Sequence, residues 1–495
     1  MEAKVEEQLK LFKTSAEDFY NPKGYKGLSR FHKYWGKKPI EGLAFFIQHF
    51  TKKGDVVMDP FLGSGLVSKV ALDNERKFIG IDVNPISIQL AKLYNNLPSY
   101  NALKKGVNCL ANRVKEDIYE SYKLKDGLTA SYYLWEDDKI KSIWNVKRGR
   151  ERIEREAKDF DYKLFEKYND YESDIIRPVN FFSNSRINAK KDHKLNDIFT
   201  GRALRNIDLL ISAIQKEENE LVKKALLLIL SASSGQMSKM VFAITRRGKN
   251  NGKKSERIEV GSWVIGYWKP DLHFEVNVWR TFNNKANKLL RGIKTVHNHR
   301  IEDVADKPDP VINGSKPLAL INDDSITVLK KLASDKVDLI IADPPHSDRI
   351  PYLELSEMWN SILKNEIDFN KEIVVSDAKE RNMDQATYKE KMIYFLKEST
   401  RVLKKEGLLI IYFNAKSEES WSYLDNFLKV KSKEIKYLGY LPSNYSAKSV
   451  VQTNRKGGLK NDYALIFYKG EESDSPKIKF LENLPHFKKE KPLIN

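Results

Sequence analysis

An acidic residue followed by two prolines begins the tetrapeptide Asp343-Pro344-Pro345-His346. The apolar, β-branched run before it, at 339–342, is typical of a strand that is buried on both faces. Two consecutive prolines can continue neither a helix interior nor a strand ladder, so the strand must end here. We therefore expect Asp343 to be held at a strand end, where open α/β sheets place their chemistry. A simple proline turn after a strand is the alternative that this peptide alone leaves open.

A second strand end lies far upstream, where the apolar residues 56–58 lead into Asp59 and a turn that contains Gly63 and Gly65. Glycines can adopt positive φ and let backbone N–H groups approach a ligand closely. A third apolar run ends in Asp82, and a carboxylate at the end of the second strand suits the hydroxyls of a ribose. The turn lacks the third glycine of the dinucleotide fingerprint, so a nicotinamide or flavin enzyme is the weaker interpretation.

The two strand ends resemble two motifs of one known family. Residues 59–65, Asp-Pro-Phe-Leu-Gly-Ser-Gly, resemble the S-adenosyl-L-methionine (AdoMet) motif of the amino-methyltransferases of DNA. Residues 343–346 resemble the catalytic Asp-Pro-Pro-Tyr tetrapeptide of that family. The resemblance covers residues ~30–100 and ~317–470 and is faint or absent between them. It implies methyl transfer from AdoMet to an exocyclic amino group, with adenine N6 favoured and cytosine N4 as the second choice.

The resemblance assigns the catalytic role to the tetrapeptide Asp343-Pro344-Pro345-His346. In the family, the aspartate and the first proline carbonyl accept hydrogens from the target amino group, and an aromatic ring stacks on the extruded base. Here His346 stands where the family has tyrosine or phenylalanine. An imidazole is planar and can stack, though with a smaller area. A structural histidine in a site that has lost turnover is the alternative.

The resemblance also implies a set of cofactor-binding residues, which are Asp59, Phe61, Gly63, Gly65, Asp82, Asp324 and Lys38. The segment 320–332 resembles the one whose acid contacts the AdoMet adenine, and Asp324 takes that role with Asp323 as its close rival. Lys38 belongs to the aromatic and basic segment 30–39, which resembles the segment that closes over the methionine end of the cofactor. Its Lys and His side chains could contact the cofactor carboxylate, and a surface loop is the alternative. The chemistry calls for no metal.

The composition fits a nucleic-acid substrate. Lysine and arginine number 86 against 68 acidic residues, a formal net charge of +18, which attracts polyanions. A generally lysine-rich proteome would give the same balance. The single cysteine excludes a disulfide framework and a cysteine-ligated zinc site. Because no apolar run reaches ~18 residues and no apolar leader opens the chain, we expect a soluble, cytoplasmic protein without a membrane partner.

The resemblance implies an α/β fold: a Rossmann-like methyltransferase core with a mostly parallel seven-stranded sheet and a large inserted, partly helical region. The order of motifs resembles the subclass of amino-methyltransferases with an intervening recognition domain. We expect a helix at 5–14, another at 40–50, and last strands at 436–441 and 463–469, joined by a basic loop. The predicted boundaries are an N-terminal extension at 1–30, the cofactor half of the core at 31–100, the insertion at 101–298, a linker at 299–316, the catalytic half at 317–470, and a polar tail at 471–495 that should fray.

The insertion is too long to be a loop and is the best candidate for reading the target sequence. Helical spacing at 204–214 and 221–230 predicts an antiparallel helix pair. A flexible basic loop follows at 245–254, and nearby aromatic residues could either pack in a core or stack on bases. The residues predicted to contact DNA are Arg246, Arg247, Lys249, Lys253 and Lys254 in this loop, with Tyr352 and Arg349 beside the flipped nucleotide.

The sequence thus predicts a site-specific methyltransferase that acts on double-stranded DNA, in a restriction-modification or related defence system. A cognate restriction endonuclease is a candidate partner, and the oligomeric state is left open. An RNA base methyltransferase is one rival, because some tRNA enzymes carry a similar tetrapeptide, although no RNA-binding module is recognisable before the core. The other rival is a basic protein of methyltransferase fold that binds nucleic acid without turnover.

Overall fold

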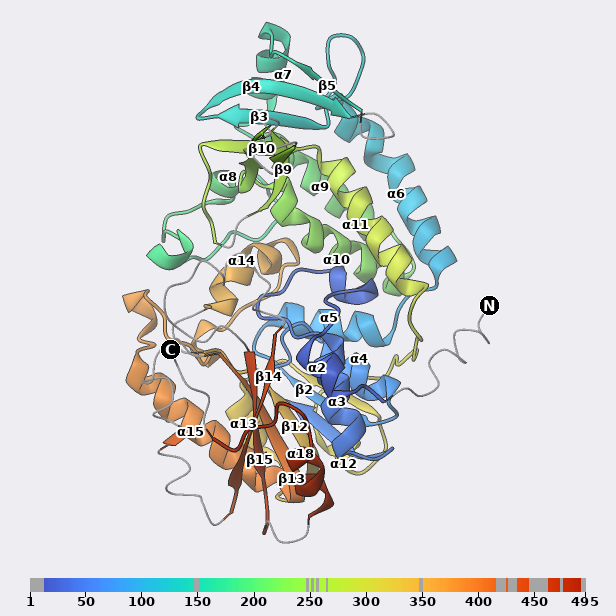
Figure 1. The fold of residues 1–495 in the computed structure, drawn as a ribbon. Coiled ribbons are helices and arrows are strands. Elements are labelled where there is room, and N and C mark those ends of the chain that lie inside the picture. The colour runs from blue at the N-terminus through green and yellow to red at the C-terminus, as the bar shows by residue number, and fades with distance from the viewer. Residues whose placement is uncertain are drawn as a thin grey trace.

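The computed structural model describes residues 13–146, 151–245, 249–250, 253–254, 258–263, 266–346, 350–414, 424–425, 434–444, 462–471 and 475–490. Figure 1 shows a large sheet with its helices at one end of the molecule and a second sheet at the other, with a layer of helices between them. The predicted helix at 5–14 lies outside the described residues except for its last two, and the basic loop before the last strand lies outside them altogether.

The large sheet has seven strands in the order β11-β2-β1-β12-β13-β15-β14. The first five of these are mutually parallel, and only β15 runs antiparallel to its neighbours. The predicted α/β fold with a mostly parallel seven-stranded sheet is therefore confirmed. The strands are β1 (Val56–Asp59), β2 (Lys77–Ile81), β11 (Leu318–Ile321), β12 (Val337–Ala342), β13 (Leu403–Phe413), β14 (Lys436–Ser443) and β15 (Asp462–Tyr468).

Both faces of this sheet are covered by helices, which explains the near-continuous apolar strands. Val57 packs into one apolar cluster, whereas its neighbours Val56 and Met58 pack into the other on the opposite face. The helices around the sheet are α2 (Ala16–Tyr20), α3 (Ile40–Phe50), α4 (Leu66–Asp73), α5 (Pro85–Asn95), α12 (Asp309–Ile312), α13 (Ser325–Lys331), α14 (Tyr352–Ile362), α15 (Gln385–Val402) and α18 (Pro476–Glu482). The predicted helix at 40–50 is confirmed as α3.

The insertion forms the rest of the molecule in Figure 1. The predicted helix pair is present as α9 (Gly201–Gln215) and α10 (Glu220–Met237), which pack with α6 (Tyr100–Glu120) and α11 (Val278–Ile293). A six-stranded antiparallel sheet with the order β5-β4-β3-β10-β6-β9 lies beyond them. Its strands are β3 (Tyr132–Glu136), β4 (Lys139–Val146), β5 (Arg152–Arg155), β6 (Val241–Ile244), β9 (Glu259–Trp263) and β10 (Leu272–Val276), and the short helices α7 (Asp159–Asn169) and α8 (Leu195–Ile198) complete the region.

Two expectations about irregular segments are wrong. The expected flexible loop at 245–254 contains a two-stranded ladder, in which β7 (Lys249–Asn250) pairs with β8 (Lys253–Lys254). The tail does not fray throughout, because Leu481 of α18 is fully buried and Lys488 forms a β-bridge with Tyr440. Among the described helices, none is long and apolar enough to cross a membrane.

The aromatic residues of the insertion belong mostly to its core. Tyr133, Trp144, Trp263 and Trp279 are all buried, and a tight T-shaped contact joins the Trp144 ring to Phe274 of β10. Large apolar rings packed in this way stabilise the second sheet rather than face a ligand. Trp268 differs, because 49% of it is exposed.

Candidate active site

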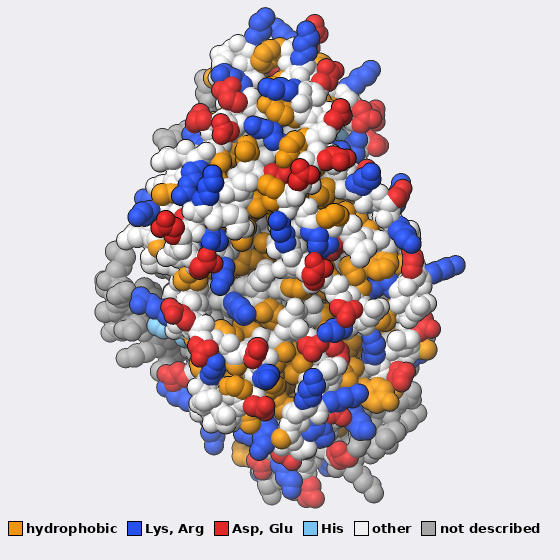
Figure 2. Space-filling model, turned by 180° about the vertical axis from the view of Figure 1, so that it is seen from behind, with side chains coloured by type: hydrophobic (Ala, Val, Ile, Leu, Met, Phe, Trp, Pro, Cys, Tyr) orange, Lys and Arg blue, Asp and Glu red, His pale blue; other side chains and the backbone are white. Residues whose placement is uncertain are grey.

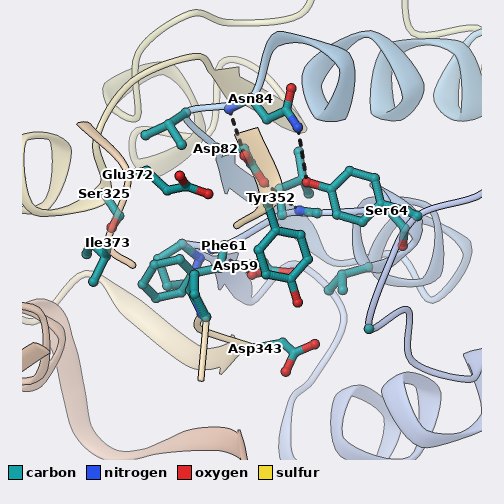
Figure 3. Close-up of a pocket in the computed structure, with 18 of the residues that line it drawn as sticks. Asp59, Phe61, Ser64, Asp82, Asn84, Ser325, Asp343, Tyr352, Glu372 and Ile373 are labelled. Atoms are coloured by element: carbon teal, nitrogen blue, oxygen red, sulfur yellow. Dashed lines mark hydrogen bonds between the residues drawn. The ribbon is translucent and has the colours of Figure 1, made fainter. Parts of the chain in front are cut away.

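A cavity with about 850 Å³ of empty space, part of it open to solvent, lies where the carboxyl ends of β1, β2, β11 and β12 meet. Figure 3 shows Asp82 and Asn84 on one side of it and Asp343 on the other, with Asp59, Phe61 and Tyr352 between them. This size and position suit a nucleoside-like ligand. Of the residues predicted to bind cofactor or substrate, those that line it are Lys38, Asp59, Phe61, Gly63, Asp82, Asp324, Asp343, Pro345 and Tyr352.

Asp82 holds the glycine turn against the end of β2. Its Oδ2 accepts the Gly63 N–H at 2.6 Å, and its Oδ1 accepts the Asn84 N–H at 2.8 Å. Gly63 has a φ of +51°, a conformation that glycine adopts without strain. Burial raises the pKa of Asp82 to about 6, against the opposing effect of these two hydrogen bonds. The carboxylate can therefore accept hydroxyl hydrogens from a ligand near neutral pH.

Asp59 is a second buried carboxyl group at the floor of the cavity, only 3% exposed. Its Oδ1 accepts the Phe61 N–H at 2.9 Å. Burial, with added repulsion from Asp343 and Asp82, raises its pKa well above the ordinary range. Asp59, Asp82 and Asp343 thus share one cavity with further carboxyl groups, so a positive charge is favoured there.

Lys38 supplies such a charge beside the catalytic candidate. Its Nζ lies 3.1 Å from Oδ2 of Asp343 and 3.4 Å from Oδ2 of Asp462, the first residue of β15. Burial disfavours the ammonium form, but the two carboxylates outweigh that effect and raise the pKa of Lys38. Lys38 lines the cavity as expected, and its contact with a cofactor stays a prediction.

His346 lies next to Asp343 but not among the residues that line the cavity. Its Nε2 is 3.5 Å from Oδ1 of Asp343, and its ring packs edge-on against Phe413, with 5.9 Å between the ring centroids. The Tyr388 hydroxyl donates a hydrogen bond of 2.7 Å to the Pro345 carbonyl, which anchors the tetrapeptide to α15. Stacking of His346 on a base stays a prediction.

The segment that precedes α3 closes over the catalytic end of the cavity. Tyr34 stacks on Tyr352 with 5.9 Å between ring centroids and an angle of 18°. A Cβ atom at Gly36, where φ is +67°, would lie 2.9 Å from the Tyr352 hydroxyl and 3.8 Å from Oδ2 of Asp343. The backbone therefore comes so close to the site here that the position requires glycine. His32 of the same segment instead hydrogen-bonds Ser231 in the buried interior.

Asp323 and Asp324 both line the other end of the cavity. Asp324 caps α13, since its Oδ2 accepts the Thr327 N–H at 2.8 Å. Asp323 accepts a hydrogen bond of 2.8 Å from Lys371, a second residue of the cavity wall. Ser325, Glu372 and Ile373 lie together on one side of the cavity in Figure 3. Each acid already has a protein partner, so the choice of adenine reader stays open.

Gly65 serves packing rather than the cavity wall. It caps α4 with a φ of +77°, and a Cβ atom there would lie 2.9 Å from the backbone nitrogen of Ala91 in α5. Because such a contact is too short, glycine lets the two helices approach each other. The predicted DNA contacts at Arg246, Arg247 and Arg349 lie outside the described residues, and only the backbone is described at Lys249, Lys253 and Lys254.

Four residues of this region were not predicted, namely Tyr34, Glu372, Tyr412 and Asp462. Asp462 had a signal, because it precedes the strand expected at 463–469. Since β15 is antiparallel, its amino end meets the carboxyl ends of the other strands. Glu372 is a buried carboxyl group that accepts the Leu353 N–H at 3.0 Å, and no local pattern marks it.

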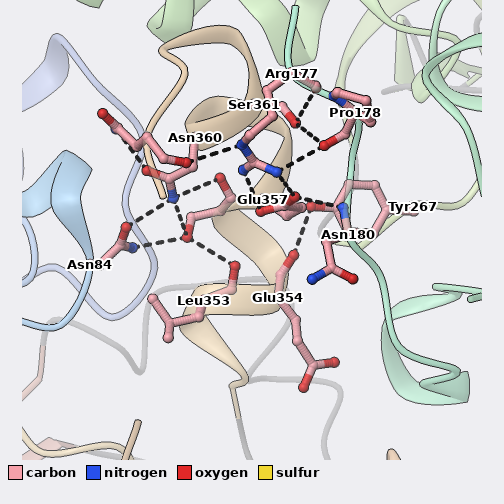
Figure 4. Close-up of polar contacts among 12 residues, drawn as sticks. Asn84, Arg177, Pro178, Asn180, Tyr267, Leu353, Glu354, Glu357, Asn360 and Ser361 are labelled. Carbon is pink, nitrogen blue, oxygen red and sulfur yellow. Dashed lines mark hydrogen bonds and ion pairs between the residues drawn. The ribbon is translucent and has the colours of Figure 1, made fainter. Parts of the chain in front are cut away.

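Helix α14, which begins with Tyr352, is anchored to the insertion by buried polar contacts (Figure 4). Arg177 binds both oxygens of Glu357 at 2.9 and 3.1 Å, and the Asn180 N–H donates to the same carboxylate at 2.6 Å. The Tyr267 hydroxyl donates to the Glu354 carbonyl at 2.8 Å. The insertion therefore touches the element that positions one wall of the cavity.

Comparison with known proteins confirms the family resemblance. Residues 4–93 match the model of a DNA methylase family. The chain is 22% identical over 355 residues to Type II methyltransferase M.MjaII of Methanocaldococcus jannaschii, which covers 65% of this chain and 60% of the relative. It is 34% identical over 107 residues to Type II methyltransferase M.XycI of Xanthomonas campestris pv. cyanopsidis, 18% of this chain and 36% of the relative. The matched parts thus span less than two thirds of these relatives.

Two further comparisons cover shorter stretches. Type II methyltransferase M.Cfr9I of Citrobacter freundii is 46% identical over 53 residues, 11% of this chain and 18% of the relative. A solved structure described as a DNA modification methylase from Thermus thermophilus is 12% identical, over 33% of this chain and 59% of that chain. Its TM-score is 0.17, which is too low to support a structural conclusion.

Proposed function

We propose that this protein is an AdoMet-dependent DNA methyltransferase that methylates an exocyclic amino group, adenine N6 in preference to cytosine N4. The observation that carries the proposal is the convergence of Asp59, Asp82 and Asp343 in one cavity at neighbouring strand ends. The Type II DNA methyltransferases among its relatives support DNA as the substrate. We place the activity in a restriction-modification or related defence system, with a cognate endonuclease as a candidate partner.

The cavity suits AdoMet in its charge and shape. Asp82 offers a buried carboxylate to a ribose, and the turn at Gly63 leaves no side chain between that carboxylate and the cavity. Phe61 and Ile373 provide apolar surface for a purine ring, beside Ser325 and the acids at 323–324. The buried cluster of carboxyl groups favours a cationic ligand.

The chemistry requires positioning more than it requires reactive groups. When bound, AdoMet supplies a methyl group on a cationic sulfur, which keeps the electron pair of the broken S–C bond and becomes a neutral thioether. Asp343 accepts one hydrogen of the target amino group and the Pro344 carbonyl accepts the other, which directs the nitrogen lone pair toward the methyl carbon. As the N–C bond forms, the carboxylate stabilises the positive charge on nitrogen and takes the departing proton.

We assign target recognition to the insertion at 101–298. Among the described residues, the methyltransferase core has no other large element that could read a base sequence, and the insertion contacts α14 directly. Tyr352 at the start of α14 faces the cavity beside Asp343, where it can hold an extruded base by stacking.

Transfer of a labelled methyl group from AdoMet to duplex DNA, compared with tRNA, tests the proposal. We expect labelled DNA with the wild-type protein, and no labelled DNA with Asp343→Ala although AdoMet still binds, because Asp343 contacts the target rather than the cofactor. Asp338→Ala on the same strand is the matched control and should retain activity. Label on tRNA alone would favour the RNA rival, and AdoMet binding without any transfer would favour the protein that has lost turnover. Methylation-sensitive sequencing of DNA from expressing cells would then identify the base and the site.

A further inference from the structure

The ion pairs of Lys38 connect two carboxylates that lie on different strands. Asp343 follows β12, whereas Asp462 begins β15, and the Lys38 ammonium lies within 3.4 Å of both. The side chains of Lys38, Asp343 and Asp462 are 9%, 23% and 14% exposed. Asn414, just after β13, donates a hydrogen bond of 2.6 Å to Oδ1 of Asp462. This contact orients Asp462 so that its other oxygen faces Lys38.

The ammonium contacts one of the two Asp343 oxygens that the target amino group could use. In the proposed reaction Asp343 accepts a hydrogen from that amino group, and here it accepts one from Lys38 at 3.1 Å. An amino group that binds Oδ2 of Asp343 therefore competes with the ammonium for this oxygen. A buried cation that loses its partner is strongly unfavourable. Asp462 removes that obstacle, because Lys38 already contacts it and need only relax toward it.

We propose that Lys38 and Asp462 form a counter-ion relay for the catalytic carboxylate. The ammonium orients the Asp343 carboxylate before DNA binds, and Asp462 retains the ammonium when the target amino group takes its place. Lys38 and Asp462 are thus positioning residues. The inference rests on the proposed function, since it assumes that Asp343 binds the target amino group.

The surroundings of Asp343 explain why a cation is needed. Burial, with added repulsion from Asp343 and Asp82, raises the pKa of Asp59 well above its ordinary range, so Asp59 and Asp343 are close enough to interact. Lys38 places a positive charge beside Asp343, with its Nζ 3.1 Å from Oδ2. The titratable and charged groups that face Asp343 from the elements around it are Lys38, Asp59, His346, Tyr352, Tyr412 and Asp462.

The test compares kcat and KM for steady-state methylation of duplex DNA by wild type, Lys38→Met and Asp462→Asn. For Asp462→Asn we expect kcat/KM for DNA to fall roughly 10- to 100-fold, because the ammonium then has only Asp343 as its charged partner. For Lys38→Met we expect kcat/KM for DNA to fall by at least as much, because no ammonium then orients the Asp343 carboxylate. AdoMet affinity measured by calorimetry should stay within about twofold of wild type in Asp462→Asn.

Two further variants separate the relay from a merely structural role. The double variant Lys38→Met/Asp462→Asn should be no worse than Lys38→Met, because Asp462 has no ammonium left to retain. Lys38→Arg keeps the charge and should retain most of the wild-type kcat/KM for DNA, which decides the question even if Lys38→Met fails to fold. Lys404→Met, which breaks an ion pair with Asp338 elsewhere on β12 and β13, is the control and should retain wild-type kinetics.

Wild-type kinetics in Asp462→Asn or in Lys38→Met would overturn the relay while leaving the proposed function intact. Losses that simply add in the double variant would also overturn it. If the wild-type protein transfers no methyl group to DNA, the proposed function itself fails, and that outcome is visible before any variant is made.

Discussion

The electrostatics of the cavity are set by a few buried side chains. Asp59 and Asp82 both have raised pKa values because water is excluded around them, and the partners of Asp82 are backbone N–H groups. Lys38 brings the opposite charge close to Asp343. Such a site binds a cation with a hydroxyl-bearing portion more readily than an anion.

The residues at strand ends could be predicted from the sequence, whereas their partners could not. Asp59, Asp82 and Asp343 each follow a short apolar run, which is a local signal. Asp462 and Lys38 meet them only because strand order and a long closing segment bring distant parts of the chain together. These contacts depend on tertiary packing, so the spacing of residues along the sequence does not predict them.

Removal of the Asp82 carboxylate should weaken AdoMet binding by roughly 1–3 kcal/mol, because a charge-assisted ribose contact is lost. Isothermal calorimetry of Asp82→Ala measures this directly. Unchanged affinity would remove Asp82 from the cofactor site. Asp55→Ala, an acid at the opposite end of β1, is the control and should bind as wild type.

The affinity for AdoMet should also depend on pH. The carboxylate form of Asp82 accepts ribose hydrogens, and its pKa is raised to about 6. Protonation below that value removes the acceptor, so affinity should rise between pH 5 and pH 7 and then level off, by at most about tenfold per unit. Calorimetry at four or five pH values gives the curve. Asp82→Asn cannot ionise and should flatten it; an equally steep curve in this variant would mean that another group titrates.

His346 should act through the planarity of its ring. His346→Phe or His346→Tyr should keep or raise turnover, whereas His346→Ala should cost ~1–3 kcal/mol in transition-state stabilisation through lost base stacking. Steady-state kinetics on duplex DNA measures both. If His346→Ala were as active as wild type, the role of His346 would be limited to its edge-on contact with Phe413.

At the scale of elements, buried strands and amphipathic helices were predictable, and the pairing of the second sheet was not. The helix pair α9 and α10 follows from apolar spacing within each helix. In contrast, β3 pairs with β10 across most of the insertion, as in the contact of Trp135 with His273. Such pairing is non-local, and the edge that a strand joins cannot be read from its own residues.

Close packing of α4 on α5 explains why glycine occupies position 65. We expect Gly65→Ala to lower the free energy of unfolding by roughly 2–4 kcal/mol, because it adds a steric clash with Ala91 to the strain of a positive φ. Gly54→Ala is the matched control, since Gly54 has a φ of +83° with nothing within 4 Å of the added Cβ. It should cost only about 1 kcal/mol. Urea unfolding of both variants provides the comparison, and equal losses would show that conformation alone selects Gly65.

At the scale of the whole molecule, the insertion and the core form one continuous structure. The Arg177–Glu357 pair, with Glu357 fully buried, joins them at α14. Figure 2 shows Lys and Arg side chains interspersed with acidic ones over the face that it displays. The net charge of +18 is therefore not segregated on that face. A DNA surface needs a local concentration of cations, and the predicted basic cluster at 246–254 offers one in the sequence.

Neutralising Arg246, Arg247, Lys249, Lys253 and Lys254 together to glutamine should weaken binding to duplex DNA and flatten its salt dependence. Each phosphate contact contributes about 0.9 to the slope of log affinity against log salt concentration, so losing several contacts should reduce the slope by several times that amount. Fluorescence anisotropy with labelled duplex DNA at several salt concentrations measures the slope.

The control neutralises five exposed lysines near the amino ends of the core strands, away from the cavity, namely Lys52, Lys53, Lys331, Lys336 and Lys405. Both variants lose five charges, so a merely electrostatic effect of net charge would change both slopes alike. A slope lowered only in the cluster variant would place DNA on the β7–β8 ladder, and an unchanged slope there would make the cluster a solvated surface.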